Sequence, residues 1–85
     1  MKTQVTFYKH GQIQRQITKP NREKAMAIAM QTLAIALEEL ALAEKSFTVE
    51  ANFLTRHDWS CTVFSGRTAT SEDEAFGVTV EKARG

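Results

Sequence analysis

The fold is decided by residues 21–45, which read NREKAMAIAMQTLAIALEELALAEK. This stretch contains no proline or glycine and is dominated by alanine, leucine and methionine, all good helix formers. Pro20 ends the segment before it, and Asn21 is a favourable N-cap residue. We therefore predict one long α-helix from Asn21 to Lys45.

Apolar side chains recur on two opposite faces of this predicted helix, which advances by about 100° per residue. One stripe consists of Met26, Met30, Leu33, Leu37 and Leu40. The second consists of Ile28, Ile35 and Leu42, flanked by Ala29, Ala36 and Ala43. A helix that covers a sheet needs only one apolar stripe, so the C-terminal segment or a second copy must cover the other. We predict a homodimer with these last six residues at its interface.

Alternating apolar and polar residues predict strands on both sides of the helix. The strands are expected at residues 3–8, 12–18, 47–53 and 59–64. Gly11 lies in the turn between the first two and can adopt a positive φ, which makes them a hairpin. Ile13 and Ile17 are expected on one side of the second strand together with Arg15, which places this strand near an edge of the sheet.

The C-terminal segment admits two interpretations. Ser71 and Glu74 form a capping box, which favours a helix over residues 71–83. Phe76, Val78 and Val80 alternate as in a strand, and Gly77 disfavours a helix. The preferred fold is α+β, a four-stranded antiparallel sheet with one long helix on one face, in the order β-β-α-β-β-α. The alternative ends in a fifth strand, β-β-α-β-β-β.

The composition is that of a single compact domain over residues 1–85, with 42% hydrophobic and 25% charged residues and a net charge of +1. Cys61 is the single cysteine, so an intramolecular disulfide is impossible. No leader peptide or bilayer-spanning segment is predicted, and we expect a cytoplasmic protein with no membrane association.

No motif with catalytic spacing is present. His57, Asp58 and Cys61 are close in sequence, but Cys61 is expected on the buried side of its strand, where a thiol is inert. His10, His57 and Cys61 lack the spacing of a metal site, and the glycines form no phosphate-binding loop. We therefore predict no catalytic, metal or cofactor site and no enzyme activity.

Two surfaces are candidates for binding a partner. Residues 1–24 carry six basic residues against one acidic residue, and such a surface can contact nucleic acid or an acidic protein. The basic residues are Lys2, Lys9, Arg15, Lys19, Arg22 and Lys24. The polar face of the sheet offers Tyr8, Leu54 and Phe64 as apolar anchors.

The second half of the chain, which includes Thr70-Ser71-Glu72-Asp73-Glu74-Ala75, loosely resembles two families. One is the double-stranded RNA-binding domain, but its basic run is replaced here by acidic residues. The other is a small antitoxin fold whose last strand leads into an acid-started helix, which the long alanine-rich helix does not match. We assign the chain to neither.

The function expected from these observations is that of a small protein-interaction module, an inhibitor or accessory factor that binds an unidentified protein and dimerises. One alternative is a phage-type inhibitor of a host defence complex, because anti-CRISPR proteins are also very small α+β chains without an active site. The other alternative is a nucleic-acid-binding module that uses the basic N-terminal hairpin.

Overall fold

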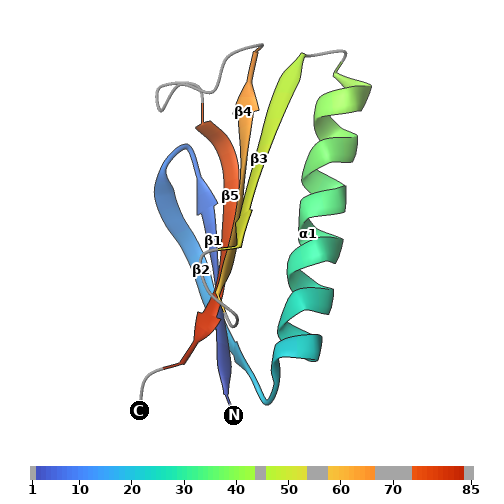
Figure 1. The fold of residues 1–85 in the computed structure, drawn as a ribbon. Helices are drawn as coiled ribbons and strands as arrows, with labels where there is room; N and C mark the ends of the chain where they lie inside the picture. Colours follow the sequence, from blue (N-terminus) through green and yellow to red (C-terminus); the bar gives the residue numbers. More distant parts are fainter. Residues whose placement is uncertain (1, 44–45, 54–57, 67–73, 84–85) are drawn as a thin grey trace.

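A helix packs on one face of an antiparallel sheet in the computed structural model, which describes residues 2–43, 46–53, 58–66 and 74–83 (Figure 1). The elements are β1 (Thr3–Lys9), β2 (Gln12–Lys19), α1 (Arg22–Leu42), β3 (Phe47–Phe53), β4 (Trp59–Ser65) and β5 (Glu74–Lys82). The five strands are ordered β2-β1-β5-β4-β3, and every neighbouring pair is antiparallel. The α+β class and the four predicted strands are confirmed.

The predicted long helix is confirmed as α1, and Asn21 is its N-cap as predicted. The Asn21 side chain accepts a hydrogen bond from the backbone N–H of Lys24 at 2.9 Å, which satisfies one of the free amides of the first turn. The helix ends at Leu42, and the N–H of Ala43 still donates to the carbonyl of Glu39 at 3.1 Å. The remainder of the predicted helix, residues 44–45, lies outside the described residues.

The last element is a strand, so the preferred C-terminal helix was wrong and the alternative with a fifth strand is confirmed. Strand β5 lies at the centre of the sheet and pairs with both β1 and β4. Val78 and Val80 are almost completely buried there. Pairing on both sides overrides the helical propensity that the acidic residues suggested. Residues 71–73 of the capping box lie outside the described part of the chain.

The hairpin of β1 and β2 closes with a tight turn. His10 and Gly11 have φ angles of 52° and 78°, and two positive values in succession are typical of a type I′ turn. The prediction of a positive φ at Gly11 is confirmed. Such a turn matches the right-handed twist of the two strands, and it fixes the register of the hairpin.

A β-bulge in this hairpin changes the side on which Ile13 lies. Val5 pairs with Ile17 and Phe7 with Arg15, but after an irregularity between Phe7 and Tyr8, Tyr8 pairs with Ile13. Antiparallel partners share a face, so Ile13 lies with Tyr8 on the face away from α1, where it is 58% exposed. The prediction that Ile13 and Ile17 share a side was therefore wrong.

The core lies between α1 and the middle of the sheet. The helix contributes Ala25, Ala29 and Leu33; Leu33 belongs to the first predicted stripe, and Met26, Leu37 and Leu40 of that stripe are partly buried against the core. Small alanine side chains allow the helix to approach the sheet closely, so they pack where larger residues were expected. Met30, from the first predicted stripe, is exposed. The sheet contributes Val5, Phe7, Trp59, Cys61, Val63, Val78 and Val80.

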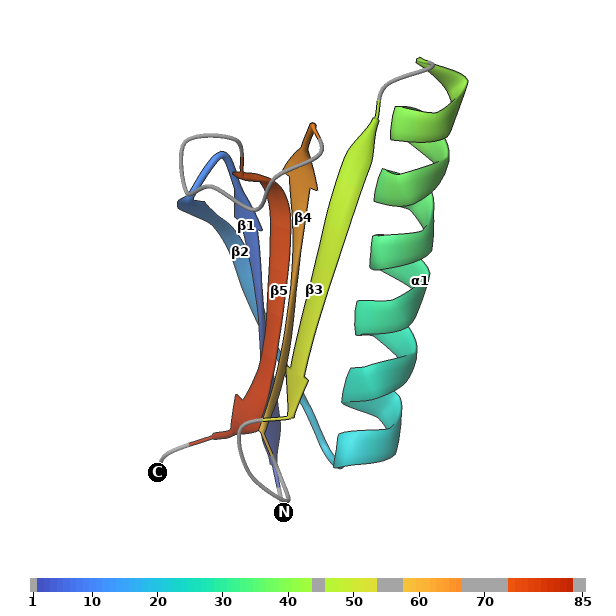
Figure 2. The same cartoon turned by 45° about the horizontal axis from the view of Figure 1, so that its top comes forward.

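Helix α1 is also long and apolar enough to cross a membrane by length and composition alone, with a mean hydropathy of 1.5. The core helix of a water-soluble protein can meet the same criterion. Here Ala25 and Ala29 of the helix pack against the sheet. Figure 2 shows the helix as a separate layer beside the sheet.

Candidate functional site

The apolar side chains of β3 are left uncovered on the side that faces the helix. Helix α1 contacts chiefly β5, β1 and β2, and β3 forms the far edge of the sheet. The β3 face, as we name it, consists of Phe47, Val49, Ala51 and Phe53. Their partners on β4 are Ser65, Val63, Cys61 and Trp59. The last three are buried, whereas Phe47, Val49 and Phe53 are 39%, 42% and 73% exposed.

The outer edge of β3 also has no partner strand among the described residues. Its register with β4 runs from Phe47 to Phe53 without a bulge. It contains no proline, lysine or arginine, and Glu50 is its single charged residue. Backbone N–H and C=O groups along such an edge are free to pair with another strand. Apolar face and free edge together make β3 the strongest candidate for a binding site.

A groove of about 620 Å³ lies on the other side of α1, between its C-terminal half and the end of the β1–β2 hairpin. Phe7 and Phe76 line it with ring centroids 6.5 Å apart. The Arg15 guanidinium lies 5.1 Å from the centroid of the Phe7 ring, a cation–π geometry. The other lining residues are Tyr8, Lys9, His10, Gln14, Thr32, Ile35, Ala36, Glu39, Leu40, Ala43 and Ala75.

The six residues predicted for a helix-mediated dimer are divided among three environments. Ala29 is completely buried in the core, and Ile28 is partly buried against it. Three others line the groove, namely Ile35, Ala36 and Ala43. Leu42 is 77% exposed at the end of the helix. The burial of Ala29 removes it from any surface of the folded chain, so these residues do not form one continuous patch.

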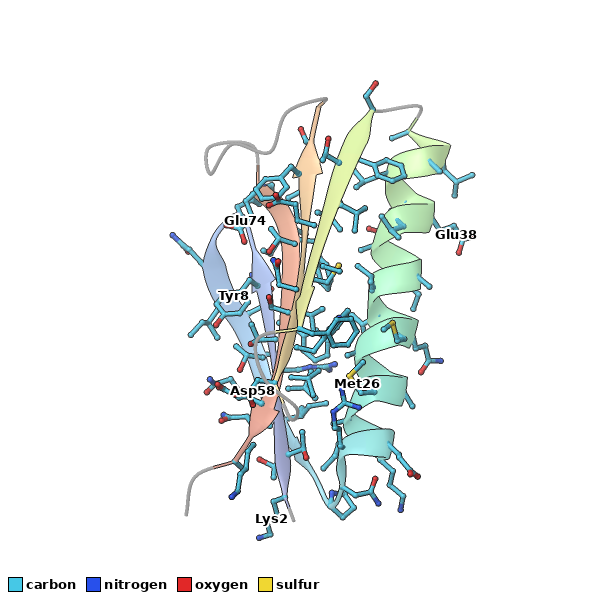
Figure 3. The ribbon with its side chains drawn as sticks, in the orientation of Figure 1. Lys2, Tyr8, Met26, Glu38, Asp58 and Glu74 are labelled. Carbon is cyan, nitrogen blue, oxygen red and sulfur yellow. The ribbon has the colours of Figure 1, made fainter. Side chains whose placement is uncertain are left out.

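The predicted basic residues are also divided, because they lie at opposite ends of the sheet. Lys9 and Arg15 line the groove at the hairpin end. At the other end, Thr3 pairs with both Lys19 and Lys82, and Lys2 precedes it (Figure 3). Arg22 and Lys24 belong to the first turn of α1, beside this second group.

The predicted anchors of the polar sheet face have different positions. Tyr8 lies on the face away from α1 and is partly exposed (Figure 3). Phe64 is buried, at 8% exposure, so it offers little surface. Leu54 lies outside the described residues.

Cys61 is buried on β4, and this burial raises the pKa of its thiol above the ordinary value. His57 lies outside the described residues, and Asp58 accepts a hydrogen bond from the backbone N–H of Lys82 at 3.2 Å. Within the described residues, no cluster of three or more His, Cys, Asp and Glu side chains could hold a metal ion.

The sequence of β3 predicts a strand but does not indicate that one of its sides is an exposed surface. The alternation of Phe47, Val49, Ala51 and Phe53 predicted the strand and its apolar side. Two facts about the whole fold make that side accessible: β5 occupies the centre of the sheet, and β3 forms an edge whose large apolar side chains stay exposed beside α1. Comparisons with protein-family models, curated proteins and solved structures find no match.

Proposed function

We propose that the chain is a non-catalytic cytoplasmic binding protein that acts through protein–protein contacts at β3. The observation that supports this proposal is that β3 combines an exposed apolar face with a strand edge that is unpaired among the described residues. Full burial of a valine or phenylalanine side chain contributes roughly 1.5–3 kcal/mol, so covering the β3 face is worth several times the thermal energy.

A protein strand matches both properties of this site. Its backbone continues the ladder of hydrogen bonds, and its alternate side chains pack on the β3 face. A small molecule would satisfy only one of the two. Within this proposal the chain serves as an inhibitor or accessory factor, and the strand that pairs with β3 belongs either to its target or to a second copy. A phage-type inhibitor of a host defence complex remains an alternative role, supported by size and architecture alone.

A nucleic-acid-binding role is the second candidate, and the gathering of Lys2, Lys19 and Lys82 at one end of the sheet supports it. Binding through such a cluster depends on the release of counterions, so it weakens steeply as salt rises. A titration of single- and double-stranded nucleic acid at low and at physiological salt tests this role. Absence of binding at low salt eliminates it.

The main proposal is tested with a photo-crosslinking amino acid, benzoylphenylalanine, placed on either edge strand. Phe53 is the test position, because it is the most exposed of the three large side chains of the β3 face. Ile13 is the matched control, an exposed apolar residue on the opposite edge strand. Irradiation of the purified chain and of an extract of its source cells should give discrete protein adducts from position 53 and none from position 13.

The masses of the adducts identify the partner as a second copy or a different protein. Equal adduct patterns from both positions, or no adduct from position 53 in either preparation, would contradict the proposal that β3 is the protein-binding site.

A further inference from the structure

Strand β3 has a sequence that is complementary to itself when two copies run antiparallel. It reads FTVEANF from Phe47 to Phe53, with apolar residues at every odd position and polar residues at every even position. Antiparallel partners share a face, so any register that pairs odd positions with odd positions brings apolar side chains together. The polar side chains then meet on the other face.

The charge of Glu50 discriminates among the symmetric registers. A twofold axis at Glu50 places two carboxylates directly opposite each other, which is destabilising. An axis at Val49 leaves Phe53, which is 73% exposed, without a partner among the residues of β3. An axis at Ala51 avoids both defects and leaves unpaired Phe47 and Thr48, of which Phe47 is less exposed than Phe53, at 39%. It pairs Val49 of each copy with Phe53 of the other, a β-branched residue with an aromatic one.

The same register satisfies the polar face. Glu50 of one copy lies opposite Asn52 of the other, and the Asn52 amide can donate a hydrogen bond to the Glu50 carboxylate. At the axis itself, the two Ala51 side chains are small enough for the strands to approach closely. The chain has a net charge of only +1, so two copies repel each other weakly.

We propose that the occupant of the β3 edge is a second copy of this chain, paired antiparallel about a twofold axis at Ala51. This inference rests on the proposed function, for which it names the partner. The axis is perpendicular to the sheet. The two five-stranded sheets therefore join into one sheet, with both helices on the same face and the two β3 faces side by side between them.

The opposite edge explains why assembly stops at two copies. In the dimer both outer edges are β2 strands. Strand β2 carries Arg15 and Lys19, and a β-bulge interrupts its pairing with β1. Charged residues and bulges are features that prevent an edge from pairing with further strands. The contact is thus isologous and closed, as in most homodimers.

The oligomeric state is the first test, measured by sedimentation equilibrium and light scattering from about 10 to 500 μM, because dimerisation follows mass action. The wild-type mass should approach twice 9.5 kDa as concentration rises. Val49→Lys places an ammonium group on the β3 face and should raise the dissociation constant at least about tenfold. Ile13→Lys is the matched control and should leave it unchanged.

Val49 is accessible enough for a lysine to reach water in the monomer, and circular dichroism with urea unfolding confirms that the variant folds. Leu42→Lys tests the helix instead. A wild-type chain that stays monomeric throughout would overturn the inference. So would a dimer that Leu42→Lys dissociates and Val49→Lys does not.

The register is the second test, made with single cysteines in a Cys61→Ala background. Under mild oxidation Ala51→Cys should form a disulfide-linked dimer, because the two residues 51 face each other. Val49→Cys alone should not, since the two residues 49 are then four residues out of register, about 13 Å along the strand. A mixture of Val49→Cys and Phe53→Cys chains should cross-link to each other.

Efficient cross-linking of Val49→Cys with none at Ala51→Cys would refute the Ala51 axis. Failure of the dimer is distinguishable from failure of the proposed function. A monomeric chain whose residue 53 crosslinks to a different protein refutes the self-pairing and supports protein binding at β3. A monomer with no adduct at all refutes both.

Discussion

The two edges of the sheet are built in opposite ways. Strand β2 is joined to its neighbour by a type I′ turn, carries Arg15 and Lys19, and is interrupted by a bulge. Strand β3 has no basic residue and no bulge, and its apolar face is uncovered. An edge strand that lacks protective features is a liability unless a partner pairs with it. The difference between the edges is therefore a guide to function.

The edges also differ in how they are held to the sheet. Arg15 of β2 covers the Phe7 ring with its guanidinium, so the strand shields part of the core. Among the described residues β3 pairs with β4 alone. One end of β3 is supported by hydrogen bonds from Thr48 Oγ1 to the Gly66 carbonyl and from Gly66 N–H to the Ser46 carbonyl. Among the described strands β2 likewise pairs with one neighbour, β1, but it also contacts α1. Strand β3 therefore depends on its neighbouring strand more than β2 does.

The largest effect is expected from Trp59→Ala. Trp59 is buried on β4, where it pairs with Phe53 of β3 and Val80 of β5. Truncation of a buried aromatic residue costs about 3–5 kcal/mol, a large part of the stability of a domain this small. Urea unfolding measures the loss, and hydrogen exchange should show that the amides of β3 lose protection before those of β2.

Ile17→Ala, on the β2 side, is the comparison for that variant. Ile17 is only partly buried against the core, so its truncation should cost less. An equal loss in the two variants would mean that the two edges are supported alike.

A second prediction removes the protection of β2. Arg15→Val combined with Lys19→Thr deletes both charges of that strand. In the dimer both outer edges are β2 strands, and once unprotected each can pair with β2 of another dimer, so that assembly no longer closes. Light scattering should then rise well above the dimer value as concentration increases. Adding Val49→Lys should suppress the rise, whereas unchanged mass in the double variant would show that these charges do not protect the edge.

The sequence carries most of the information about local elements and little about which of them become edges. Asn21 identified the start of α1, and alternation identified four strands, because both signals lie within a few residues. The centre of the sheet was not predictable in this way. Strand β5 is stabilised by β1 and β4 together, and these partners are far away in the chain.

The candidate site depends on the same non-local facts. The periodicity of α1 predicted two stripes of large residues, and Leu33 of the first stripe does lie in the core. Ala25 and Ala29 also face the sheet, because close helix–sheet approach favours small side chains there. Ala29, which was predicted at a dimer interface, is therefore buried between the helix and the sheet. The bulge after Phe7 similarly moved Ile13 to the other face. Periodicity could not indicate that the β3 face would remain uncovered.

A third prediction concerns the turn that holds β2. Gly11 has a φ of 78°, and forcing a residue with a Cβ into this left-handed region costs roughly 1–2 kcal/mol. Gly11→Val should lower the free energy of unfolding by about that amount and leave the dimerisation of β3 unchanged. Gln12→Val, within β2, is the control with ordinary strand geometry. A changed dimer constant in Gly11→Val would show that the two edges are coupled.

The smallest effect is expected in the reactivity of Cys61, which reports on the opening of β3. Cys61 is buried on β4 directly opposite Ala51. Its raised pKa leaves less thiolate than a free thiol has at the same pH, so a disulfide reagent should react slowly. The unfolded chain deprotonates near the ordinary thiol pKa of 9.0 and the folded chain at a higher pH, so folding stability should fall as pH rises above 9.0.

The rate at which a disulfide reagent labels Cys61 at pH 8 then compares the two edge strands, β2 and β3. Phe53→Ser removes the most exposed contact of β3 with its neighbours, and a loss of about 1 kcal/mol in the cost of opening corresponds to roughly a fivefold faster reaction. Ile13→Ser, on β2, should leave the rate unchanged, because Cys61 is reached by opening the β3 side. Raising the protein concentration should slow the wild-type reaction, since a paired β3 opens less often. A rate that responds equally to both substitutions and not to concentration would remove the kinetic distinction between the two edges.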